Sequence, residues 1–141
     1  MSKDKFLNPD FKPDANTFKE IEALYKEGES LSGIQLQFSD MKNVNLINAD
    51  LSNSDLTRAD FSGASMYGVN LEGANLFKTN LEGANLKAAN MKNCNMLGAD
   101  FSNTKLNNVN WDSDYKIINE REAEEALSSG DVDLAKEKYS E

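Results

Sequence analysis

The chain has 141 residues and a net charge of −9, with one cysteine and no histidine. The missing histidine removes the commonest general base and metal ligand, and the acidic total argues against direct nucleic-acid binding through phosphate contacts. The single Cys94 allows no intrachain disulfide, and no apolar run is long enough to span a membrane or to act as a leader. The composition therefore predicts a cytoplasmic protein without a membrane segment.

Residues 1–33 are expected to form an N-terminal tail and a helix that caps the following domain. The helix covers residues 17–28, because Phe18, Ile21, Leu24 and Tyr25 fall on one helical face. Thr17 and Glu20 have the spacing of a capping box, and Gly28 is expected to end the helix.

Residues 34–113 divide into sixteen five-residue units without an insertion. We call the large apolar residue of each unit position i; it runs in steps of five from Leu36 to Trp111. Position i−2 holds a small or β-branched residue in every unit. In one unit this residue is Cys94, which we expect to replace alanine in the core. Positions i−2 and i point to the same side of an extended segment, which predicts that both face inward.

The two remaining residues, i+1 and i+2, must turn a corner before the next inward residue. Eleven of the sixteen i+2 positions hold Gly or Asn, which tolerate the positive φ that a type II turn requires. Phe38, Arg58 and Lys78 occupy the same position and disfavour positive φ. We therefore expect a different turn type at these three corners.

Thirteen of the sixteen i−1 positions hold Asn or Asp, so that the unit reads A(D/N)LXX. This motif resembles the pentapeptide-repeat family over residues 34–113. The resemblance implies an all-β solenoid: a right-handed quadrilateral parallel β-helix of about four coils, with four units per coil. The period of five alone leaves the number of sides open.

Residues 114–141 are expected to form a C-terminal helical segment and hold nine acidic and four basic residues. The pattern favours helices at about 118–128 and 131–140, with Asp131 as the N-cap of the second. We expect this segment to be truncated from a longer protein. Val132, Ala135 and Tyr139 would form an apolar stripe, from which we expect a homodimer through the C-terminal helices.

We identify no candidate catalytic, cofactor-binding or metal-binding residues, and we expect no cofactor. A coil of 20 residues would place Phe77 beside Leu97, and Ile47 beside Tyr67, as candidate protein-interaction patches on opposite faces. The unbroken repeat, the missing histidine and the lack of a long loop favour a non-catalytic scaffold or protein-interaction module. The patches add the expectation of an unidentified protein partner. The alternative comes from the resemblance: a DNA-mimicking protein that binds and protects a type II topoisomerase. A mildly acidic strip agrees with that alternative; it consists of Asp40, Asp60, Glu82 and Asp100.

Overall fold

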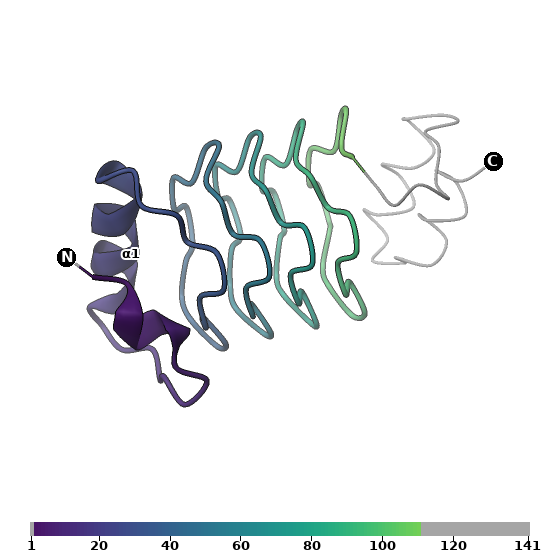
Figure 1. The fold of residues 1–141 in the computed structure, drawn as a ribbon. Coiled ribbons are helices and arrows are strands. Elements are labelled where there is room, and N and C mark those ends of the chain that lie inside the picture. The colour runs from purple at the N-terminus through teal and green to yellow at the C-terminus, as the bar shows by residue number, and fades with distance from the viewer. Residues whose placement is uncertain (1, 111–141) are drawn as a thin grey trace.

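The computed structural model describes residues 2–110, and residues 1 and 111–141 lie outside the described part. A short 3-10 helix, η1 (Asp4–Leu7), and an α-helix, α1 (Thr17–Lys26), precede four stacked coils (Figure 1). The expected C-terminal helices, with Trp111, Val132, Ala135 and Tyr139, fall outside the described residues.

Parallel backbone pairing holds the coils together. Twelve parallel bridges connect the described coils, from Gln35–Asp55 to Asn90–Asn110, and each joins residues that are 20 apart. Four five-residue units therefore complete one coil, which confirms the quadrilateral β-helix. The ladder begins at Leu31, whose amide donates to the carbonyl of Asp50 at 2.9 Å.

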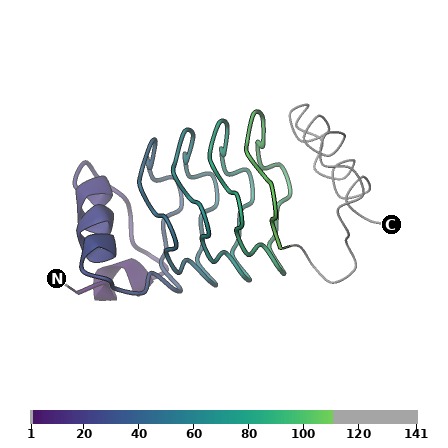
Figure 2. The same ribbon diagram turned by 90° about the horizontal axis from the view of Figure 1, so that it is seen from above.

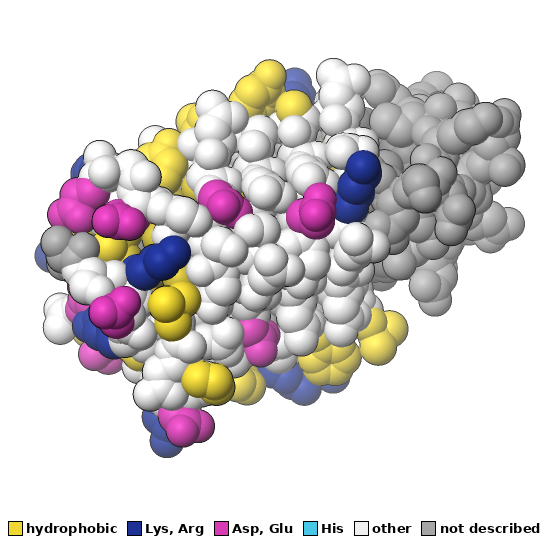
Figure 3. Space-filling model, in the orientation of Figure 1, with side chains coloured by type: hydrophobic (Ala, Val, Ile, Leu, Met, Phe, Trp, Pro, Cys, Tyr) yellow, Lys and Arg dark blue, Asp and Glu magenta, His cyan; other side chains and the backbone are white. Residues whose placement is uncertain are grey.

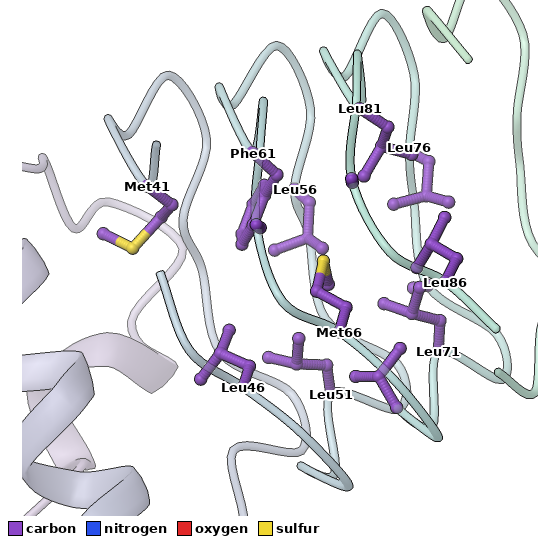
Figure 4. Packing of buried hydrophobic residues seen from close by; sticks show 14 of the residues in the cluster. Met41, Leu46, Leu51, Leu56, Phe61, Met66, Leu71, Leu76, Leu81 and Leu86 are labelled. Atoms are coloured by element: carbon purple, nitrogen blue, oxygen red, sulfur yellow. The ribbon is translucent and has the colours of Figure 1, made fainter. Parts of the chain in front are cut away.

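The interior is filled by the two inward positions of each unit, and Figure 4 shows the stacked i residues from Met41 to Leu86. All described i residues are buried, including Leu76 and Leu86 with no exposed surface, as predicted. The i−2 residues are buried as well, except for the half-buried Cys94. The Cys94 thiol donates to the carbonyl of Leu71, as the Thr79 hydroxyl does to Leu56, so the expected inward placement of Cys94 is confirmed.

The corners are uniform, and the expected second turn type is wrong. Phe38, Arg58 and Lys78 have φ values of 63°, 58° and 53°, within the range of the Asn corners. The backbone explains this uniformity, because each i+2 amide from Phe38 to Ala88 donates to the i+1 carbonyl one coil further on. For Arg58 the acceptor is Phe77, at 2.9 Å. Stacked corners must superimpose to keep these bonds, so the coil sets φ whatever the side chain.

The Asn and Asp residues at i−1 have a structural role that sequence reasoning missed. In twelve units the side-chain oxygen at i−1 accepts a hydrogen bond from the i+1 amide, at 2.9 to 3.3 Å. Among the described units the bond is missing only where i−1 is Gln35, Ser65 or Lys105. These Asx turns start each corner and explain the preference for Asn and Asp.

The N-terminal residues cap the first coil, as expected, and α1 lies across that end of the solenoid in both views (Figures 1 and 2). Ile21 and Leu24 of α1 are fully buried in the same core as the coils, and so is Phe6 of η1. The Phe6 carbonyl accepts the amide of Gln35 at 2.6 Å, which satisfies a donor on the open edge of the first coil.

The two ends of α1 differ in how well the sequence predicted them. The end at Gly28 is confirmed: φ is 77°, and the amides of Gly28 and Glu29 donate back to the last turn. The capping box is wrong. The Thr17 hydroxyl accepts a hydrogen bond from the Asp14 amide. The Glu20 carboxylate forms an ion pair with Lys5 instead of capping the first turn of the helix.

Candidate protein-interaction surface

The 20-residue coil brings both expected apolar pairs together. The amide of Lys78 donates to the carbonyl of Leu97, which stacks Phe77 and Leu97 on neighbouring coils. The amide of Asn48 donates to the carbonyl of Tyr67 and stacks Ile47 beside Tyr67 in the same way. The two pairs lie two units apart in a four-unit coil, so they occupy diagonally opposite corners.

The first corner also gathers residues that sequence reasoning did not include in the pair. We define the Phe77 corner as Phe38, Arg58, Phe77, Lys78 and Leu97. Phe38 and Leu97 are the two most exposed large apolar residues described, with 70% and 64% of their surface accessible. The Phe77 ring lies beneath two cations, with Arg58 Cζ at 5.8 Å and Lys78 Nζ at 5.4 Å from its centroid. These contacts explain why Phe77 is half-buried.

The two cations of the Phe77 corner lack a carboxylate partner within residues 2–110. The described ion pairs are Lys5–Glu20 and Lys42–Asp60, and neither involves Arg58 or Lys78. Two positive charges therefore share one aromatic ring with no carboxylate of residues 2–110 paired to them, in a chain whose net charge is −9. This arrangement attracts carboxylates more than any neutral corner would.

A cavity of about 730 Å³ adjoins the Phe77 corner where the first coil meets the N-terminal residues. Phe38 forms part of its wall and so connects it with the corner. Its lining residues are Pro9, Asp10, Phe11, Lys12, Pro13, Gln37 and Phe38. The expected apolar patches were drawn from position i+1 alone. Phe38 was grouped with Arg58 and Lys78 at i+2 only as a turn residue, so its exposed ring was not added to the patch.

The opposite corner, which we call the Tyr67 corner, consists of Ile47, Tyr67, Lys87 and Ala88. Ile47 and Tyr67 are 38% and 47% exposed. The Tyr25 hydroxyl of α1 donates to the Ile47 carbonyl at 2.7 Å, so the cap already contacts this corner. The Tyr67 corner thus offers less free apolar surface than the Phe77 corner.

The acidic strip is partly neutralised within the fold. Lys42 Nζ lies 3.7 Å from Asp60 Oδ2, and both the amide and the hydroxyl of Ser62 donate to Asp60. Burial by itself would raise the pKa of Asp60, but the hydrogen bonds from Ser62 and the charge of Lys42 outweigh it and hold the pKa below its usual value. Figure 3 shows acidic side chains scattered over the visible face, which is mostly uncharged.

Residues 2–110 contain no group of three or more His, Cys, Asp or Glu side chains placed to hold a metal ion. Within the same residues, no helix has the length and apolarity needed to cross a membrane.

Comparisons with solved structures agree with the four-sided coil. The pentapeptide-repeat protein Rfr23 from the cyanobacterium Cyanothece 51142 is 36% identical with a TM-score of 0.59; the match covers 60% of this chain and 58% of Rfr23. The pentapeptide-repeat protein alr5209 from Nostoc is 24% identical with a TM-score of 0.52, over 69% of this chain and 94% of its own. QnrB1, a plasmid-mediated fluoroquinolone resistance protein, aligns at 20% identity and a TM-score of only 0.33, over 60% of this chain and 54% of its own.

No protein with a curated description matches the chain. The family description "Pentapeptide repeats" matches in eight copies, over residues 30–68, 39–76 and 70–108. These ranges together cover more than half of the chain and coincide with the four coils. The chain therefore belongs to the pentapeptide-repeat family.

Proposed function

We propose that this chain is a non-catalytic protein-interaction module and that it binds its partner through the Phe77 corner. One observation carries the proposal: Phe38, Arg58 and Lys78 hold a positive φ that Gly or Asn provides at eleven of the other described corners. Ala88 is the remaining exception, so three of the four unfavourable residues lie on one corner.

The energetics of these residues favour a role outside folding. A side chain other than Gly or Asn in the left-handed region is less stable by about 1 kcal/mol. Phe38, Arg58 and Lys78 are all exposed, so burial in the core does not offset this. Strained residues that gain little from packing are typical of binding sites. The exposed apolar area of Phe38 and Leu97 is what a protein partner would cover.

The proposal is tested with the full chain as bait in a cell lysate. The double variant Phe77→Thr/Leu97→Gln uses residues that occur at the same position of other coils. Thr is found there at Thr57 and Gln at Gln37. The control is Tyr67→Thr at the opposite corner. We expect proteins captured by the natural chain and by the control to be lost from the double variant. An identical set of captured proteins for all three would refute the proposal.

Protection of a type II topoisomerase is the second candidate, and the acidic strip is the observation that favours it. The strip carries Asp40, Asp60, Glu82 and Asp100 along one side, but Lys42 already pairs with Asp60. A phosphate mimic needs dense charge along its length, which this strip does not supply. A gyrase supercoiling assay with a quinolone separates the candidates, because only the second predicts that the chain rescues activity.

A further inference from the structure

We propose that the Phe77 corner binds the acidic segment 114–141 of a second copy of this chain, so that two chains exchange these segments around a two-fold axis. The inference rests on the proposed function, because it assigns a partner to the same surface. It joins a cationic, apolar corner, whose Phe38 and Leu97 are exposed, with an acidic segment of the same sequence.

The corner and the segment carry opposite charges. Residues 114–141 hold nine acidic and four basic residues, a net charge of −5. Arg58 and Lys78 are held over the Phe77 ring and have no carboxylate within 4 Å among the described residues. Each exposed charge pair contributes little alone. A two-fold pair makes every contact twice, and the second set forms within an already associated pair.

The apolar residues of the two surfaces also match. The segment carries Val132, Ala135 and Tyr139 at helical spacing. The corner presents Phe38 and Leu97, both more than half exposed, and the cavity of about 730 Å³ beside Phe38 has room for a large side chain. An acidic segment without apolar residues would leave Phe38 and Leu97 exposed. Segment 114–141 has both acidic and apolar residues.

The length of the segment is sufficient. The corner runs across three coil spacings, or about 14 Å. The 28 residues of the segment span about 42 Å as a helix and about 90 Å when extended. The segment can therefore reach a neighbouring chain and still cover the whole corner. Reciprocal exchange closes the pair, which prevents open-ended association.

Zero-length crosslinking of the full chain tests the contact directly. A carbodiimide joins an amine to a carboxylate only when the two touch, and a mixture of ¹⁴N-labelled and ¹⁵N-labelled chains marks links between different copies. We expect mixed-isotope links from Lys78 to carboxylates of residues 114–141. Lys87, on the opposite corner, is the matched control, and its links to the segment should be several-fold fewer.

Arg58→Asn provides a second arm that does not endanger the fold, because Asn holds the same φ at six other corners. Removing one cation should lower the yield of links from Lys78 several-fold while the thermal unfolding profile stays cooperative. Links from Lys78 to the segment only within one chain would overturn the inference, and so would equal yields from Lys78 and Lys87. If the lysate experiment finds a foreign partner at this corner and Lys78 forms no link to the segment, the inference fails and the proposed function stands.

Discussion

At the scale of single residues, the φ angle at each corner is set by the stacked backbone and not by the preference of the side chain. Arg58 and Lys78 adopt φ values of 58° and 53°, although neither residue favours them. The sequence reasoning weighed each corner by its own residue and therefore predicted a different turn. The hydrogen bond from the Arg58 amide to the next coil forms only when the coils stack. The conformational preference of a single residue therefore cannot predict it.

Replacing Arg58 or Lys78 by Asn should raise the free energy of unfolding by about 1 kcal/mol each, because Asn is more stable in the left-handed region. Urea denaturation measures the change. Lys87→Asn serves as the control, since Lys87 precedes the positive-φ residue of its corner, and it should stay within about 0.5 kcal/mol of the natural chain. Destabilisation by Arg58→Asn would show that its side chain contributes more through Phe77 than its backbone loses.

Asp60 should make the fold sensitive to acid. Its folded pKa lies below the usual value of 3.8, so its carboxylate stabilises the fold above about pH 4, and this stabilisation is lost as the pH falls through the folded pKa. Asp60→Asn does not titrate and can accept the same bonds, as Asn80 does from the Glu82 amide. Between pH 6 and pH 3, the urea midpoint of the natural chain should fall further than that of the variant. Parallel curves would contradict the assignment.

At the scale of elements, the inward positions could be predicted from the sequence and the ends of the helix only in part. Leu76 and Leu86 are buried because their spacing fixes the side of the chain on which they lie. The number of sides came from the family resemblance and not from the period. The capping box at Thr17 failed because Glu20 meets Lys5, and a tertiary partner of this kind is invisible in local spacing. Phe6 was missed because a single apolar residue has no periodicity.

Leu76→Ala should destabilise the coils by about 2 to 5 kcal/mol, because it opens a cavity between stacked residues. The matched control is Leu97→Ala, the same substitution at a residue that is 64% exposed, and its effect should stay below about 1 kcal/mol. Denaturant unfolding of both variants gives the comparison. Equal effects would mean that Leu76 does not support the core.

Two corner glycines separate backbone strain from crowding. Gly68 and Gly83 have nearly the same φ, 68° and 69°, but a Cβ on Gly68 would collide with the Asn48 side chain, whereas Gly83 has open space. Both substitutions by Ala should destabilise the fold through φ, by about 1 kcal/mol. Gly68→Ala should cost more, and unfolding curves of the two variants measure the difference. A larger loss for Gly83→Ala would be inconsistent with the stacking of corners.

At the scale of the whole molecule, the two ends of the solenoid differ in how residues 2–110 satisfy their backbone hydrogen bonds. The N-terminal end is covered by η1 and α1, with Phe6 and Tyr25 bonding to backbone groups of the first coil. At the other end, the amides of Met96, Phe101 and Leu106 have no acceptor among the described residues. Acceptors for these amides would have to come from residues 111–141 or from another chain.

The residues of the Phe77 corner lower the folding stability of the chain and provide a binding surface. Light scattering and urea denaturation of the full-length Arg58→Asn/Lys78→Asn variant test both parts in one protein. We predict a dimer for the natural chain and for the control Lys87→Asn/Lys105→Asn. For the corner variant we predict a monomer that resists urea better than the natural chain. A natural chain that stays monomeric at high concentration, or a corner variant that stays dimeric, would contradict the exchange of segments. A corner variant that resists urea no better than the natural chain would contradict the loss of stability at the corner.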